Sequence, residues 1–222
     1  MFAYSFMQRA LIAIILLGII LPIIGLNMTT KRLSMIGDTL SHTSLCGIAL
    51  GLAAGTMPTV WAIGVSIVAG IIIEIVRNHF KKYSELTLSI VMSTAVGVAG
   101  ILTSKWASGN KIESYLFGSL ITVQWDSIWI IIGVSIITIL FNLIFYRTIM
   151  YTSYSESEAR ISGVPVKAMN LINTILVACV VAVASSIIGS LLVSSLLVIP
   201  VASSLQLCKS YKFTMLLSLI HI

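Results

Sequence analysis

Two ionisable side chains inside a long apolar stretch have a spacing that suits a metal site. Asp38 and His42 are four residues apart, so a helix would place both on one face. A carboxylate and an imidazole together suit a borderline cation such as zinc or a harder one such as manganese. One chain would supply two ligands, and two chains across a symmetry axis would complete a tetrahedral site. A structural alternative stays open, in which Asp38 caps the start of a helix and holds His42 one turn on.

Small residues follow this pair along the same stretch. Cys46 is one turn beyond His42, but a buried thiol that packs on a neighbouring helix is a simpler interpretation than a third ligand. Gly47, Gly51 and Gly55 recur every four residues, and small residues at that spacing let helices approach closely. We expect these glycines to form a packing face toward another helix of the chain or toward a partner subunit.

The composition places all of these residues in a membrane. Hydrophobic residues make up 58% of the 222 residues and charged residues 9%, whereas a soluble domain has about 25% charged residues. So few charges cannot cover a water-soluble surface, which excludes a soluble enzyme, a nucleic-acid-binding module and a disordered chain. The sequence predicts an all-α polytopic transmembrane bundle, with residues 1–222 forming a single domain.

Nearly uncharged stretches set the number of spans, because a helix needs about 20 apolar residues to cross the bilayer. Single spans are predicted over residues 10–26, 86–104 and 127–146, and two spans each over 33–73 and 168–208, with breaks near 55–58 and 185–190. Residues 213–222 begin another helix that stops within the bilayer. We therefore expect seven complete spans, a truncated eighth and a shortened C-terminus. The apolar segment 113–124 is too short to cross and predicts an interfacial or re-entrant element.

Basic residues set the orientation of the bundle. If the first span ends in the cytoplasm, ten of the 13 lysines and arginines lie inside and three lie outside, as the positive-inside rule requires. The lysines and arginines that give the net charge of +6 therefore orient the protein in the membrane. They do not indicate nucleic-acid binding. The N-terminus is expected outside and the loop 147–168 in the cytoplasm.

This cytoplasmic loop carries the signals of a short helix. Ser155 and Glu158 form an S-x-x-E capping box, which satisfies free N–H groups at a helix start. Gly163 provides a C-terminal stop, and Pro165 follows it. A helix is predicted over residues 156–162. It could be a docking element for a soluble partner, or only a structured turn.

Four stretches of the sequence resemble the ABC-3 family, the permeases of ABC transporters that take up zinc, manganese or iron. They are RLSMIGDTLSH at 32–42, YLFGSL at 115–120, EAR at 158–160 with GVPV at 163–166, and GSLLVS at 189–194 leading into Ile199 and Pro200. The stretches occur in the family's order over nearly the whole chain. Each alone would be weak, but together they are specific.

The resemblance implies a homodimeric permease that is not itself an enzyme. A cytoplasmic ATP-binding subunit would drive it, and an extracytoplasmic metal-binding protein would supply it. The chain has no P-loop sequence with which to bind ATP. The resemblance also implies that Asp38 and His42 are the intramembrane metal ligands. The coupling helix that contacts the ATPase would include Glu156, Glu158, Ala159, Arg160 and Gly163.

The predicted function is import of zinc or manganese through the bacterial cytoplasmic membrane, with the metal as substrate and no other cofactor. A secondary transporter driven by a proton or sodium gradient is the main alternative, but it predicts more membrane carboxylates and paired broken helices. A membrane metalloenzyme would need a catalytic set beyond one Asp–His pair. A vitamin or siderophore permease would not need that pair.

Overall fold

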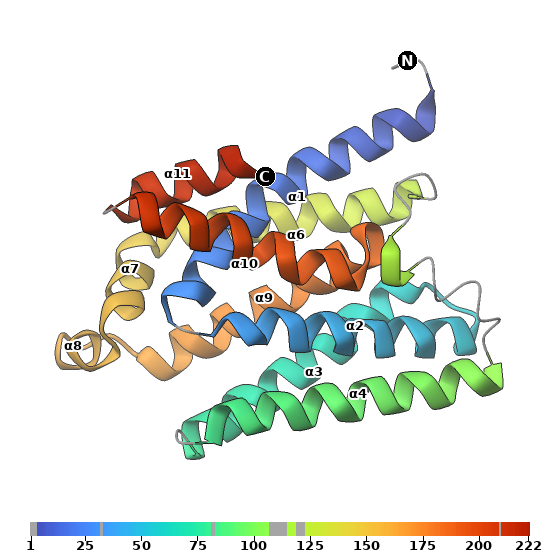
Figure 1. Cartoon of the computed structure of the whole chain (residues 1–222), viewed down its shortest axis with the longest axis horizontal. Coiled ribbons are helices and arrows are strands. Elements are labelled where there is room, and N and C mark those ends of the chain that lie inside the picture. The colour runs from blue at the N-terminus through green and yellow to red at the C-terminus, as the bar shows by residue number, and fades with distance from the viewer. Residues whose placement is uncertain (1–3, 32, 81–82, 107–114, 119–122, 209) are drawn as a thin grey trace.

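The structure, a computed structural model, describes residues 4–31, 33–80, 83–106, 115–118, 123–208 and 210–222 (Figure 1). Throughout these ranges the regular structure is helical and no strand is found. The helices are α1 (Ser5–Thr30), α2 (Ser34–Ala54), α3 (Pro58–His79), α4 (Ser84–Trp106), α6 (Trp125–Ile144), α7 (Tyr146–Tyr154), α8 (Glu156–Ile161), α9 (Val166–Ile188), α10 (Ser190–Leu207) and α11 (Tyr211–His221).

The breaks between the long helices fall near 55–58 and 185–190, where the sequence predicts them, and glycine and proline set them. Gly55 ends α2 in the left-handed region with φ of 67°, and α3 begins at Pro58. Only glycine adopts such a conformation at little cost, and proline is favoured in the first turn of a helix. Gly189, with φ of 95°, separates α9 from α10. The helix α7, by contrast, lies inside the segment that the sequence analysis treated as a loop.

Helix length and hydropathy support fewer membrane spans than the seven complete spans expected from the sequence. Among the described helices, α1, α3, α4, α6, α9 and α10 are long and apolar enough to cross a membrane. The helix α2 has 21 residues, but Asp38, His42 and several hydroxyl side chains lower its mean hydropathy. The helix α11 has 11 residues. Six spans therefore follow from length and hydropathy, and these criteria do not establish seven with a truncated eighth.

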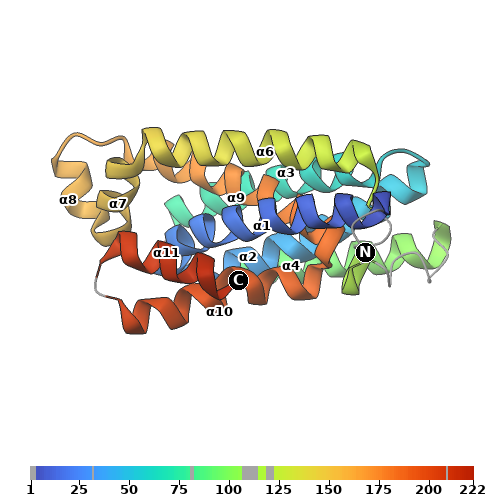
Figure 2. The same ribbon diagram turned by 90° about the horizontal axis from the view of Figure 1, so that it is seen from above.

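The long helices run roughly side by side (Figures 1 and 2). The helix α2, which carries Asp38 and His42, has most of its residues buried. α2 packs against α3, α4, α9 and α10. The centre of the bundle is α9, in which Val180, Val181, Ala182, Val183 and Ala184 are fully buried. α4 and α6 expose apolar side chains along most of their length, as expected for helices that face lipid.

The two ends of the bundle differ in charge. At one end, called here the α8 end, lie α7, α8 and the start of α9 (Figure 1). The helix bounds place six described basic residues at this end, namely Lys31, Arg77, Arg147, Arg160, Lys167 and Lys212, and two, Arg9 and Lys105, at the opposite end. Arg32, Lys81, Lys82, Lys111 and Lys209 lie outside the described residues, as do residues 113–114 and 119–122 of the segment 113–124.

Candidate metal site and coupling helix

Asp38 and His42 lie on one face of α2 that remains partly open. His42 Nε2 is 3.7 Å from Asp38 Oδ1, and the two side chains are 19% and 40% exposed, respectively. This separation exceeds hydrogen-bond length, so the two side chains lie near each other without a hydrogen bond between them. Met35, one turn earlier on this face, is 50% exposed. The described chain thus leaves a strip of α2 uncovered, with both candidate ligands on it.

Other faces of α2 are occupied by the same chain. A Cβ added to Gly37 would lie 3.1 Å from the Leu197 side chain of α10. Ser44 Oγ donates a hydrogen bond to Ser185 Oγ of α9, at 2.8 Å. Cys46 is buried against alanines of α4, which agrees with a packing role for this thiol. These faces of α2 are therefore covered within the described chain, whereas the face with Asp38 and His42 stays partly exposed.

The three regularly spaced glycines of α2 have two different roles. A Cβ on Gly47 would lie 2.6 Å from Ala62 Cα, and one on Gly51 would lie 2.7 Å from Pro58 Cα. Both glycines therefore allow α2 to contact α3 of the same chain. Gly55 differs from this expectation, because no atom lies within 4 Å of its Cβ position. Its role is to end α2, and it does not pack a helix.

Beyond His42, the open strip of α2 is covered by a short segment from a distant part of the sequence. Leu45 and Ala49 continue the face of His42 and pack under Tyr115 and Leu116. The strip is therefore open toward the α8 end and closed toward the opposite end.

Two glycines hold this covering segment in place. Gly118 has φ of 80° and Gly189 has φ of 95°. A Cβ on Gly189 would lie 2.5 Å from Gly118 N, and one on Gly118 would lie 2.2 Å from Ile188 O. The segment thus contacts the α9–α10 break backbone to backbone, and neither position has room for a side chain.

One described chain does not hold a complete metal site. No group of three or more His, Cys, Asp and Glu side chains that could hold a metal occurs among the described residues. Asp38 and His42 offer one carboxylate and one imidazole, which is half of a four-coordinate set. They lie on a face that the chain leaves open, so a second copy could complete the set.

The predicted short helix is present as α8, and its start is capped on one side only. Ser155 Oγ accepts a hydrogen bond from the Glu158 backbone N–H at 3.3 Å, which is the first half of the capping box. The second half is replaced, because the Ser155 N–H donates to Tyr151 O at the end of α7. α8 is therefore joined tightly to the preceding helix.

The end of α8 has the hydrogen bonds of a Schellman motif. The Gly163 N–H donates to Arg160 O at 3.1 Å, and the Val164 N–H donates to Ala159 O at 3.0 Å. Gly163 has φ of 82°, which this type of helix end requires at that position. Capping at both ends gives a helix of six residues a defined shape.

The side chains of α8 divide between an inner and an outer face. Ala159 is buried against the bundle, whereas Glu158 and Arg160 are exposed. Ile161 is 87% exposed. The outer face of α8 therefore carries a carboxylate, a guanidinium and an apolar side chain, all exposed at the basic end of the molecule.

Glu156 turns away from the outer face and joins α8 to the bundle. Asn170 Nδ2 of α9 donates to Glu156 Oε1 at 2.8 Å, and Lys31 Nζ at the end of α1 donates to Asn170 Oδ1 at 2.7 Å. Burial lowers the pKa of the Lys31 ammonium to about 8, and the Glu156 carboxylate opposes this shift. Lys31 therefore stays protonated at neutral pH. We call the three residues the Lys31–Asn170–Glu156 bridge.

A second polar cluster joins further helices near the α8 end. Asn27 is fully buried in α1, and its amide donates to Asn142 of α6 at 3.1 Å and to Asn173 of α9 at 3.5 Å. The Tyr211 hydroxyl of α11 donates to Asn27 Oδ1. The sequence places these polar side chains near the ends of apolar stretches, but only the fold shows that they contact one another.

An ion pair at the end of α3 also belongs to this region. Arg77 donates to Glu74 Oε1 at 2.8 Å. Glu74 is buried, and its other oxygen accepts a hydrogen bond from Thr174 Oγ1 of α9 at 3.3 Å. The pair therefore ties α3 to α9.

Comparison with known proteins gives one consistent result. The model of the ABC 3 transport family matches residues 3–221. The "Probable metal transport system membrane protein" of Treponema pallidum is 33% identical over 97% of this chain and 81% of its own length. The "Manganese import system permease protein ScaB" of Streptococcus gordonii is 30% identical over 97% of this chain and 77% of that protein.

Two further comparisons extend this result. The "High-affinity zinc uptake system membrane protein ZnuB" of Haemophilus influenzae is 27% identical over 93% of this chain and 80% of its own length. The solved structure "PsaBC from Streptococcus pneumoniae in complex with Fab" superimposes with a TM-score of 0.85 at 28% identity. It covers 98% of this chain and 79% of the solved one.

The helical bundle, with six described helices long and apolar enough to cross a membrane, defines a multi-pass protein of the cell membrane. The chain belongs to the ABC 3 transport family. It is a permease subunit of an ABC transporter, as the sequence motifs predict.

Proposed function

We propose that this chain imports manganese or zinc as one half of a homodimer, and that Asp38 and His42 are its metal ligands. The observation that supports this most strongly is the open face of α2, where the His42 and Asp38 side chains stay 19% and 40% exposed, respectively. Ionisable side chains at membrane depth are costly and are usually functional. Two such faces across a two-fold axis would bring two carboxylates and two imidazoles together. This interpretation replaces the capping alternative, because Asp38 lies inside α2 and not at its first residue.

The transport cycle follows from the two sides of this site. The strip of α2 is open toward the α8 end, which the predicted orientation places in the cytoplasm. Toward the opposite end, called here the outer end, it is closed by Tyr115 and Leu116. A metal ion held by the paired side chains would leave toward the cytoplasm in this conformation. Closure of the inner side and opening of the outer side would then be driven by the ATPase, in an alternating equilibrium.

The ligand set fits both metals that the relatives' names mention. Imidazole suits zinc, carboxylate suits manganese, and in vivo selection depends on geometry and metal supply as well as on affinity. A metal-binding protein outside the cell would deliver the ion. Uptake of labelled manganese and of labelled zinc by a strain that lacks its own importer tests this. We expect saturable uptake of at least one of them that requires the ATP-binding subunit. ATP-independent uptake driven by a proton or sodium gradient would instead support the secondary transporter.

The orientation of the chain is tested by cysteine labelling. We expect a cysteine at Ser157, on the exposed side of α8, to react with a membrane-impermeant reagent only after permeabilisation. A cysteine at Thr56, in the exposed turn between α2 and α3, should react in intact cells or spheroplasts. Cys46, Cys179 and Cys208 are replaced beforehand. The reverse pattern would put α8 outside and remove its contact with an ATPase.

The proposed contact with the ATPase uses the outer face of α8. Glu158, Arg160 and Ile161 are exposed there, and the caps keep the helix rigid. Glu158→Pro should weaken ATPase binding and abolish transport, because proline disfavours the conformation of the preceding Ser157 and removes the N–H that Ser155 caps. Co-purification of the ATPase and uptake are the measurements. Normal values of both would show that α8 is only a turn.

The Lys31–Asn170–Glu156 bridge would carry movement of α8 into α1 and α9. Asn170→Asp removes the donor to Glu156 and places two carboxylates together, so we expect ATP hydrolysis to continue while the metal imported per ATP falls several-fold. The double variant Asn170→Asp/Glu156→Gln moves one carboxylate from residue 156 to residue 170 and restores a donor. It should recover most of the coupling. A double variant as defective as the single one would contradict this role, provided that both are inserted normally.

A further inference from the structure

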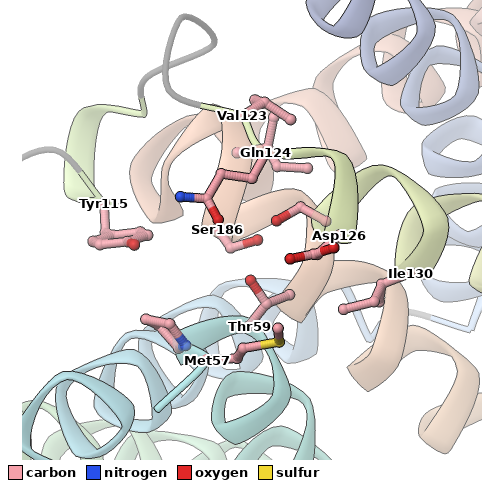
Figure 3. Close-up of a pocket in the computed structure, with 11 residues that line it drawn as sticks. Met57, Thr59, Tyr115, Val123, Gln124, Asp126, Ile130 and Ser186 are labelled. Atoms are coloured by element: carbon pink, nitrogen blue, oxygen red, sulfur yellow. The ribbon is translucent and has the colours of Figure 1, made fainter. Parts of the chain in front are cut away.

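A polar cavity lies at the outer end of the bundle, apart from the open face of α2. It is formed by the starts of α3 and α6, the end of α9 and Tyr115, and has a volume of about 230 Å³ (Figure 3). The described residues that line it are Met57, Pro58, Thr59, Tyr115, Val123, Gln124, Asp126, Ser127, Ile130, Ser186 and Ile187. The metal site proposed above uses none of them.

Oxygen atoms from three helices and a loop converge on this cavity. Figure 3 shows the Asp126 carboxylate, the Gln124 amide and the Thr59 and Ser186 hydroxyls directed into it. Asp126 is the single charged side chain among the described lining residues. Thr59 is only 9% exposed, whereas Gln124 and Asp126 are exposed.

We propose that this cavity is an outer loading site for a hydrated divalent cation, which precedes the Asp38–His42 site. The inference rests on the proposed import of a metal. Carboxylate, amide and hydroxyl oxygens are ligands for hard cations that keep part of their water. Since a water molecule takes about 30 Å³ of liquid volume, the cavity has room for an ion with several waters.

Tyr115 connects the cavity to the α2 strip. Its side chain lines the cavity and also packs with Leu45 and Ala49, the residues that follow His42 on the same face. Ala49 is seven residues beyond His42, which corresponds to about 10 Å along a helix. Tyr115 therefore contacts both the cavity and the part of α2 that continues the strip beyond His42.

The charges around the cavity favour weak binding. α3 and α6 begin beside it, and the partial positive charges of their N-termini oppose a cation. Asp126 and the C-terminal end of α9 act in the opposite direction. A site on a transport pathway must bind well enough to be occupied and weakly enough to release its ion, and one carboxylate with neutral oxygens meets both conditions.

Direct Mn²⁺ binding to the purified full chain tests the proposal. In the His42→Ala variant, electron paramagnetic resonance of free Mn²⁺ should show a weak binding event that remains after loss of the inner site. Adding Asp126→Asn should weaken it about tenfold or more, because the main attraction is lost. Adding Thr59→Val should weaken it to a smaller extent. The matched control Glu85→Gln, which removes an exposed carboxylate at the opposite end of the bundle, should leave it unchanged.

Uptake measurements with the inner site intact separate ion binding from docking of a delivery protein. Asp126→Asn and Thr59→Val should each raise the KM for uptake and preserve the maximal rate. Thr59 is too buried for a docked protein to contact. The proposal is overturned if His42→Ala shows no weak Mn²⁺ binding, or if Asp126→Asn changes uptake while Thr59→Val and Mn²⁺ binding stay normal. Neither result would affect the Asp38–His42 site, which is tested separately by uptake in His42→Ala.

Discussion

Replacing His42 with alanine should abolish metal uptake while the protein still inserts in the membrane at normal levels. The imidazole lies on the open face of α2, 3.7 Å from the Asp38 carboxylate, and a symmetric dimer would lose two of its four ligands at once. Removing a polar side chain from a membrane helix should not impair insertion, since such groups oppose it. Uptake of labelled manganese and zinc, together with the amount of protein in the membrane fraction, measures both effects.

The matched control for this prediction is His79→Ala. His79 is exposed at the end of α3, where its Nδ1 lies 3.1 Å from Ile75 O of the same helix, so its loss should leave uptake unchanged. Asp38→Asn should resemble His42→Ala, because it removes the charge that neutralises the ion. Wild-type uptake by a correctly inserted His42→Ala protein would exclude His42 as a ligand.

Replacing Gly189 with alanine should strongly destabilise the outer end of the bundle. Gly189 has φ of 95° and ψ of 146°, a region that is essentially restricted to glycine and costs other residues about 1–3 kcal/mol. The new Cβ would also lie 2.5 Å from Leu116 O. We expect a lower melting temperature in detergent and loss of uptake, and the same for Gly118→Ala.

Two glycines without close neighbours provide the comparison. Gly97 of α4 and Gly133 of α6 have no atom within 4 Å of their Cβ positions. Alanine at either position should not lower the melting temperature, because alanine is the better helix former. Equal stability of Gly189→Ala and Gly97→Ala would show that the contact between Gly118 and Gly189 does not hold the fold together.

Local signals in the sequence were sufficient to predict most helix boundaries. Long apolar runs mark the helices, and Gly55, Pro58 and Gly189 mark their breaks. Hydropathy was less informative about α2, since the polar side chains that give this helix its site also lower its hydropathy. The helix α7 was missed because it is a short amphipathic element of nine residues beside a much stronger apolar run.

Contacts between distant segments could not be predicted from the sequence. The i, i+4 spacing placed Asp38 and His42 on one face, but it could not tell that this face is the one the chain leaves open. The direction of Glu156 depends on Asn170, which belongs to another helix. The contact of Gly118 with Gly189 depends on how two irregular segments meet. The outer cavity, for the same reason, appears only when three helix ends are assembled.

The central claim is that two chains share one metal ion between two Asp38 and two His42 side chains. X-ray absorption spectroscopy on the zinc- or manganese-loaded dimer, combined with metal titration, tests it most directly. We expect one tightly bound ion per two chains, with two imidazole nitrogens in its first coordination shell that are lost in His42→Ala. One tight ion per chain, or a tight site whose shell contains no imidazole, would contradict it.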